Sequence, residues 1–99
     1  MMLLTKKNRQ DLPLLHSQDG KGQEAVAVVK FFTPDSNWTW YATEFDGDDT
    51  FFGLVDGFER ELGYFSLSEL TKARGPLGLN IERDRHWKPT KLSDISTAI

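Results

Sequence analysis

Residues 31–65 read FFTPDSNWTWYATEFDGDDTFFGLVDGFERELGYF, and this stretch decides the fold. It contains eleven of the twelve aromatic residues of the chain. Apolar and β-branched residues run in segments of strand length, and clusters of Gly, Asp, Asn and Pro separate them. The pattern predicts strands over Trp38–Phe45, Thr50–Phe58 and Gly63–Phe65, with an Asp-Gly turn at Asp46–Asp49 between the first two.

A further strand is expected upstream, over Ala25–Phe32, where AVAVVKFF is apolar on both faces. That pattern is typical of a strand covered on two sides. Pro34 and Asp35, which are residue types favoured in turns, follow this strand. Because the consecutive strands are joined by short loops, we expect an antiparallel meander.

Short helices are expected before and after the strands along the chain. Thr5 is a suitable N-cap for a helix that ends at Leu12, the residue before a proline. Ser66 and Glu69 have the spacing of a capping box, which predicts a helix to Arg74, ahead of a Gly-Pro pair.

In the tail, Ile81, Arg83, Arg85 and Trp87 alternate with Glu82, Asp84 and His86, which suggests a surface strand. Residues 90–99 suggest a final short helix capped near Ser93. Ninety-nine residues are enough for one domain. The sequence therefore predicts a single domain over residues 1–99 of the α+β class. We expect an antiparallel β-meander of three to five strands with short flanking helices.

Composition excludes several kinds of site. The chain has no cysteine, which removes disulfides, thiolate metal sites and cysteine nucleophiles. Its two histidines, His16 and His86, lack metal-binding spacing, so we expect no metal and no cofactor. No apolar run is long enough for a membrane span or a signal sequence, so we expect a cytoplasmic protein without a membrane partner.

Charge is unevenly distributed along the chain. From Asp35 to Glu69 the sequence contains nine carboxylates and one cation, Arg60, for a local net charge of −8. Residues 71–99 carry six cations and three acids, and residues 1–34 carry five cations and three acids. The chain thus has an acidic centre between mildly basic ends.

A binding surface is expected where aromatic and acidic residues meet. An uninterrupted strand over 38–45 places Trp38, Trp40, Ala42 and Glu44 on one face, and Thr39, Tyr41, Thr43 and Phe45 on the other. Aromatic residues usually serve as core packing. If one face leaves an aromatic exposed beside the acids, however, it forms an anchor suited to a basic protein partner. The candidate binding residues are Trp38, Trp40, Tyr41, Glu44, Asp46, Asp48 and Asp49.

A calcium loop fits the acidic turn poorly. Counted from Asp46, an EF-hand needs an oxygen ligand at the fifth position and glycine at the sixth, where this chain has Thr50 and Phe51. A hydrated hairpin turn is the better interpretation of these acids.

Two other functions lack their sequence signatures. Phe52–Val55 is similar to the centre of an RNA-binding RRM strand, but the basic residue and the last aromatic residue of that motif are missing. Because the carboxylates fall in turns, where they stay hydrated, the sequence does not favour an enzyme and indicates no catalytic residues.

Residues Val29–Leu70 (VKFFTPDSNWTWYATEFDGDDTFFGLVDGFERELGYFSLSEL) and Arg74–Asp84 (RGPLGLNIERD) carry a resemblance to a known family. The chain resembles a domain-of-unknown-function family of small bacterial proteins carried on plasmids, integrating conjugative elements and phages. The resemblance implies no catalytic residues. It implies a mobile-element setting, for which countering host defence, plasmid upkeep and assisting transfer are suitable roles.

Two functions from different classes remain. The first is an accessory protein that binds a basic protein partner through the acidic, aromatic surface. The alternative is a nucleic-acid-associated accessory protein that uses the basic C-terminal segment, which is rich in Arg and Lys from Arg74 to Lys91.

Overall fold

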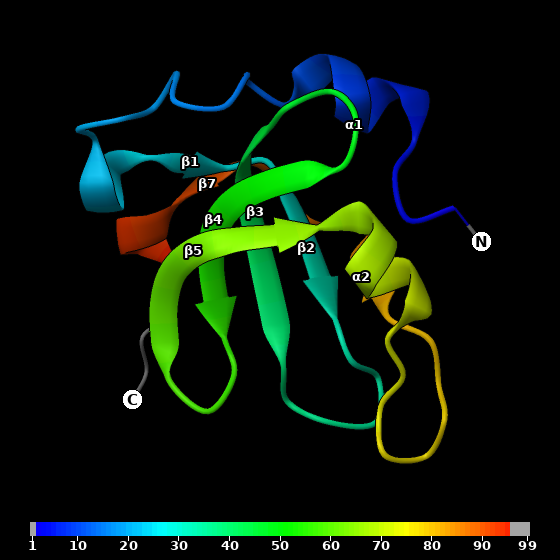
Figure 1. Cartoon of the computed structure of the whole chain (residues 1–99). Helices are drawn as coiled ribbons and strands as arrows, with labels where there is room; N and C mark the ends of the chain where they lie inside the picture. Colours follow the sequence, from blue (N-terminus) through cyan, green and yellow to red (C-terminus); the bar gives the residue numbers. More distant parts are fainter. Residues whose placement is uncertain (1, 96–99) are drawn as a thin grey trace.

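The computed structural model describes residues 2–95 and contains a five-stranded antiparallel sheet in the order β5-β4-β3-β2-β6 (Figure 1). Strands β2 to β5 follow one another both in the sheet and along the chain, so the predicted meander is confirmed. The described elements are α1 (Lys6–Asp11), η1 (Gly22–Glu24), β1 (Val26–Ala27), β2 (Val29–Phe32), β3 (Thr39–Phe45), β4 (Thr50–Asp56), β5 (Arg60–Ser66), α2 (Leu67–Lys72), β6 (Glu82–Arg83), β7 (Thr90–Lys91) and η2 (Leu92–Asp94).

The predicted strand Ala25–Phe32 is wrong as a single element, because it divides at Val28 into β1 and β2. These two strands belong to different sheets: β1 pairs with β7, and β2 pairs with β3 and β6. Ala27 packs into one core and Val29 into the other, although residues two apart share a face in a continuous strand. The apolar run therefore serves two cores in succession.

Strands β4 and β5 differ in length from the prediction. Strand β4 ends at Asp56 because Gly57 and Phe58 lie in the turn that follows it. Strand β5 begins at Arg60 and pairs with β4 over seven residues, so it is longer than the predicted Gly63–Phe65. Of the predicted tail strand, only β6 forms, against β2.

A β-bulge in β3 changes which side chains share a face. Ala42 pairs with Gly53 and Glu44 pairs with Phe52, so one extra residue lies between the two pairs. The shift puts Phe45 into the same core as Ala42, and Glu44 lines a pocket with Phe52 on the other side. The predicted alternation over 38–45 is therefore wrong beyond the bulge.

Both predicted helix starts are confirmed. Thr5 accepts a hydrogen bond from the backbone N–H of Asn8 at 3.0 Å and caps α1. Ser66 and Glu69 form the capping box of α2. The final helix predicted near Ser93 is a single 3₁₀ turn, η2, and the rest of that prediction, residues 96–99, lies outside the described residues.

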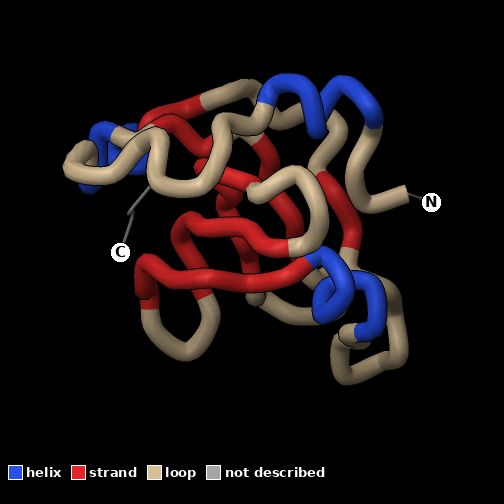
Figure 2. Tube along the Cα trace, turned by 45° about the horizontal axis from the view of Figure 1, so that its top comes forward, coloured by secondary structure: helices blue, strands red, loops and turns tan. Residues whose placement is uncertain are grey.

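Each face of the sheet carries a core, and the short helices lie at the periphery of the strands (Figure 2). The sheet and its two α-helices confirm the α+β class in outline, with more strands than expected because of the separate β1-β7 sheet. The larger core packs the sheet against the N-terminal segment and α2; its buried members are Leu4, Leu12, Val29, Phe31, Ala42, Phe45, Phe51, Phe65, Leu70 and Ile81. The smaller core packs the other face against the β1 and η2 region; its buried members are Ala25, Ala27, Tyr41, Leu54, Leu92 and Ile95.

Candidate functional site

The predicted binding residues lie on or beside β3, but the structure divides them between its two ends. Trp38 precedes β3 and Asp46 follows it. A strand of seven residues is about 23 Å long, so the tryptophans and the turn acids lie at opposite ends of the sheet (Figure 1). The structure therefore does not bring the seven residues together on one continuous surface.

Glu44 is buried, with 2 % of its surface exposed. Its two carboxylate oxygens accept hydrogen bonds from the backbone N–H groups of His16 and Gln18, both at 2.7 Å. The Gln18 side chain in turn donates to the carbonyl of Thr43 at 2.7 Å and accepts from the N–H of Val26 at 2.8 Å. His16 has a φ of 73°, a left-handed conformation that is uncommon outside glycine. Glu44 thus fixes this loop against the sheet.

Asp46 organises the turn between β3 and β4. Its Oδ1 accepts hydrogen bonds from the backbone N–H groups of Asp48 and Asp49, both at 2.8 Å, and of Thr50 at 3.1 Å. These bonds, with that from Asp48 the largest contribution, hold the pKa of Asp46 below its usual value. Gly47 supplies the positive φ, 88°, that the turn requires.

Asp49 joins this turn to α2. Its carboxylate accepts hydrogen bonds from the backbone N–H and the hydroxyl of Ser68, both at 2.8 Å, and its carbonyl accepts from the N–H of Leu67 at 2.8 Å. Asp48 is exposed in the same turn, and its carboxylate takes part in none of these bonds. Of the four predicted acids, Asp48 is thus the one left to face solvent without a structural task.

Tyr41 lies on the opposite face of the sheet from Trp40. It is 8 % exposed and packs against Trp87, with the ring centroids 5.5 Å apart. Burial raises the pKa of the Tyr41 hydroxyl, the carboxylate of Asp56 adds to the effect, and the guanidinium of Arg60 opposes it. Tyr41 is therefore core packing.

Three aromatic rings gather at the other end of β3. Trp38 lies between Trp40, with centroids 5.9 Å apart, and Phe58, with centroids 5.2 Å apart. Phe58 is 95 % exposed. A Cβ at Gly57 would overlap the Trp38 ring, so the glycine permits this contact. We call Trp38, Trp40, Phe58 and the adjacent exposed Glu59 the aromatic end.

Sequence reasoning missed Phe58, because an aromatic residue at the end of an apolar run looks like the last residue of a strand. A signal was available. Asp56-Gly57 is a favoured pair in hairpin turns, and Phe58 follows it directly. A residue at a hairpin tip lies beyond the reach of the core, whatever its hydrophobicity.

An apolar pocket of about 260 Å³ borders the aromatic end and is lined by Trp38, Trp40, Pro76 and Ile81, among others. Its far wall is the turn over residues 74–80. Asp35 holds that turn in place: its Oδ2 accepts hydrogen bonds from the backbone N–H of Leu77 at 2.8 Å and of Leu79 at 3.4 Å. The aromatic end therefore combines a protruding ring with a neighbouring apolar hollow.

A family model described as a protein of unknown function (DUF2958) matches residues 3–97. The chain belongs to the DUF2958 family. The match covers both cores, the acidic turn and the aromatic end. The comparison with curated proteins found no match, and neither did the comparison with solved structures.

In this DUF2958 protein, much of the basic C-terminal segment has structural tasks. Arg83 donates to the carbonyls of Met2 and Leu3, at 2.8 and 2.9 Å. Lys91 pairs with Glu24 at 3.1 Å, and that hydrogen bond raises the pKa of Lys91. Arg74 donates to the carbonyls of Thr71 and Ala73, whereas Arg85 and Lys88 are exposed.

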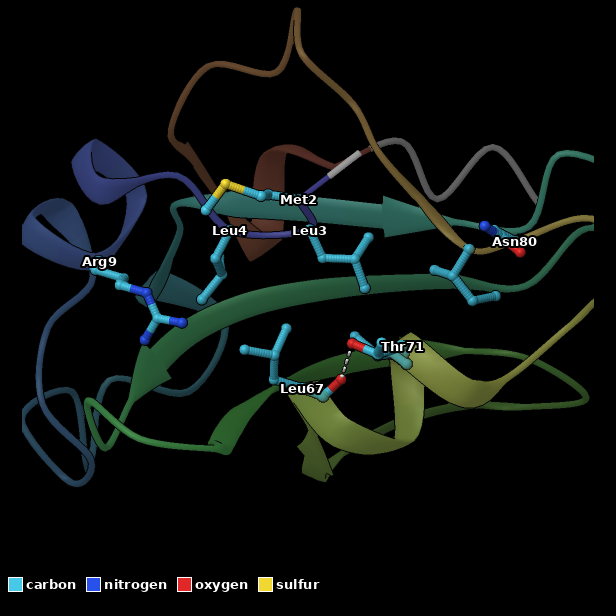
Figure 3. Close-up of a pocket in the computed structure, with 9 residues that line it drawn as sticks. Met2, Leu3, Leu4, Arg9, Leu67, Thr71 and Asn80 are labelled. Carbon is cyan, nitrogen blue, oxygen red and sulfur yellow. Dashed lines mark hydrogen bonds between the residues drawn. The ribbon is translucent and has the colours of Figure 1, made fainter.

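A second pocket of about 270 Å³ lies between the N-terminal segment and α2 (Figure 3). Figure 3 shows Leu3, Leu4 and Leu67 pointing toward the same space. The Thr71 hydroxyl there donates to the carbonyl of Leu67 at 2.8 Å, so it is not free for a ligand. Arg9 is the one charged residue of the described lining, which therefore has no acid-base pair.

Two observations concern other classes of site. Among residues 2–95, no group of three or more His, Cys, Asp or Glu side chains could hold a metal ion. None of the helices in the described part of the DUF2958 chain is long and apolar enough to cross a bilayer.

Proposed function

We propose that this protein is a small non-enzymatic accessory protein of a bacterial mobile element that binds a protein partner with a basic surface. The aromatic end is the docking surface. The observation that supports this proposal most is the 95 % exposure of Phe58.

The position of Phe58 gives it little burial. A phenylalanine stabilises a protein by removing apolar surface from water, and Phe58 leaves almost all of its surface in water. Its edge-to-face contact with Trp38 instead holds the ring in a defined orientation. A pre-oriented aromatic beside an apolar pocket is the arrangement found at the centres of protein interfaces.

One exposed acid at the aromatic end, Glu59, and the acidic middle of the chain favour a basic partner. Glu59 is exposed next to Phe58, and the stretch from Asp35 to Glu69 has a net charge of −8. A field of one sign accelerates association with an oppositely charged surface and weakens as salt is added. A partner with basic residues around an apolar patch therefore fits this surface. Proteins of the host that act on nucleic acids have basic surfaces, which agrees with a role in countering host defence.

Capture experiments with matched variants test the proposal. The immobilised protein is incubated with bacterial lysate at low ionic strength, in parallel with Phe58→Ser and Glu59→Lys. Leu14→Ser is the control, since Leu14 is also exposed (68 %) but lies away from the aromatic end, next to the loop held by Glu44. We expect one or more captured proteins to be lost with both test variants and retained with the control.

Captured proteins that are unaffected by both variants would contradict the proposal. An anisotropy titration with DNA and RNA at ~50 mM salt examines the nucleic-acid alternative under conditions that favour phosphate contacts. Tight binding there, lost with Arg85→Ala and Lys88→Ala, would replace the aromatic end with the basic segment as the functional surface.

A further inference from the structure

The two edges of the five-stranded sheet differ in how they meet solvent. One edge is β6, which has two residues, both charged. The other edge is β5, which has seven residues and pairs with β4 without a register shift. Within residues 2–95, no segment pairs with the outer side of β5. Native edges are usually protected by shortness, bulges, proline or charged side chains. Strand β5 has seven residues and no bulge or proline, and its two charges, Arg60 and Glu61, lie at its start.

The alternation of hydrogen bonds between β4 and β5 shows which backbone groups of β5 face outward. In an antiparallel pair, residues alternate between hydrogen-bonded and non-bonded positions. At the two ends of this pair, Leu67 donates to Asp49 at 2.8 Å and Gly57 donates to Glu59 at 3.1 Å. Odd-numbered residues of β5 therefore bond to β4. The N–H and C=O groups of Leu62 and Tyr64 point away from it, toward the open edge.

The side chains at this edge form an apolar strip on one face. Leu62 is 43 % exposed and Tyr64 is 60 % exposed, and the Tyr64 ring packs on Phe52 with centroids 5.0 Å apart. A pocket of about 350 Å³ lies beside the strip, lined by Leu62, Phe52 and Leu92, among others. A side chain from an added strand that shares the face of Leu62 would reach this pocket.

The charges around β5 select the occupant. Glu61 is exposed on the face opposite Leu62, and Glu59 precedes the strand. Arg60, at the start of β5, pairs with Asp56 at 3.7 Å, which leaves Glu59 and Glu61 as the exposed charges of this edge. A second copy would bring the same two acids to the new edge, and like charges across it disfavour pairing. A strand with apolar residues on one face and lysine or arginine on the other complements both faces of β5.

We infer that the partner docks an extended segment along β5, adding a sixth strand to the sheet, with alternating apolar and basic residues. Main-chain hydrogen bonds to Leu62 and Tyr64 supply affinity, and Glu61 and the pocket supply specificity. This inference rests on the proposed function for the basic character of the partner. It identifies that partner as one with a free, strand-forming segment.

Synthetic peptides test the pairing directly. The probe is a capped heptapeptide of alternating lysine and valine, and the charge-reversed control replaces lysine with glutamate. Binding is followed by NMR on the labelled full chain. We expect the lysine peptide to shift the amide signals of Leu62 and Tyr64 and to slow their hydrogen exchange. The Gly63 amide serves as the internal reference for hydrogen exchange, because its N–H already bonds to β4.

N-methylation separates strand pairing from simple charge attraction. One peptide is methylated on every valine and another on every lysine, because only one of these N–H sets faces β5. We expect methylation of one set to weaken binding about tenfold for each blocked hydrogen bond and the other to have little effect. On the protein side, Leu62→Pro removes an outward N–H and should abolish binding, whereas Leu62→Ala should weaken it only modestly.

Each outcome bears on the inference. No binding of the lysine peptide, or equal effects of the two methylated peptides, overturns strand addition. If capture from lysate still depends on Phe58 in that case, the proposed function stands and only its β5 component falls. If the lysine peptide binds with the expected pattern while capture is insensitive to Phe58, β5 is the docking site and the aromatic end is not.

Discussion

The two ends of β3 carry the residues that look most functional in the sequence, and they use them in opposite ways. At the end occupied by the turn 46–49, carboxylates accept hydrogen bonds from the protein's own backbone. At the end occupied by Trp38 and Phe58, an aromatic ring stands in solvent. At the first end, polar groups stabilise the fold. At the second end, the apolar ring of Phe58 is not buried by the fold.

This difference shows that side-chain type is a weaker guide to function than the task a residue already performs. A carboxylate whose oxygens accept backbone N–H groups is satisfied and has little to gain from a partner. A protruding phenylalanine gains by being covered. Substitutions should therefore affect stability at the acidic end and binding at the aromatic end.

Glu44→Ala should have the largest effect on stability. It removes two hydrogen bonds to a buried carboxylate and leaves the N–H groups of His16 and Gln18 without their acceptor. We expect a loss of about 3 kcal/mol or more in the free energy of unfolding. Urea denaturation measures it, with the exposed Asp48→Ala as the control. A loss no larger than that of the control would show that the loop does not depend on Glu44.

Asp49→Ala should have a smaller effect, because it removes the contact between the acidic turn and the start of α2. Loss of a helix-capping interaction costs about 1 kcal/mol. A double-mutant cycle with Ser68→Ala isolates the pair, since the Ser68 hydroxyl donates to Asp49 at 2.8 Å. Additive losses of stability in the cycle would mean that this hydrogen bond contributes nothing.

Asp46→Asn should make stability less sensitive to acid. The folded-state pKa of Asp46 is lowered, so its carboxylate contributes stability above its unfolded pKa, and that contribution is lost as pH falls through the folded pKa. The difference between wild type and Asp46→Asn should therefore be constant near neutral pH and shrink below about pH 4. Urea denaturation across this range measures it. Asp48→Asn, in the same turn, controls for the loss of one surface charge; an identical pH profile for the two variants would refute the assignment.

Phe58→Ser should change stability least, by roughly 0.5 kcal/mol or less, because the ring is already in solvent. The same variant should lose partner capture. A stability loss comparable to that of Glu44→Ala would instead make Phe58 a structural residue. That result would remove the contrast between the two ends.

The features predicted correctly from the sequence are those determined by neighbours along the chain. The presence of a strand within Trp38–Phe45, the Asp46-Gly47 turn and the Ser66–Glu69 capping box all depend on residues a few positions apart. The prediction failed where distant contacts decide. The division at Val28 depends on the pairing of β1 with β7, more than sixty residues away in the chain, and the bulge at Thr43 depends on how β3 pairs with β4.

By itself, the sequence determined that this chain forms an antiparallel meander with capped short helices, an acidic middle and too many aromatics for one face. Only the tertiary structure decided which acids accept hydrogen bonds from the backbone and which aromatic rings are buried. Glu44 finds its donors 26 and 28 positions away, and Phe58 is left at a hairpin tip where no core can cover it. Local propensity acts between neighbours, whereas burial and hydrogen-bond satisfaction arise when distant segments meet.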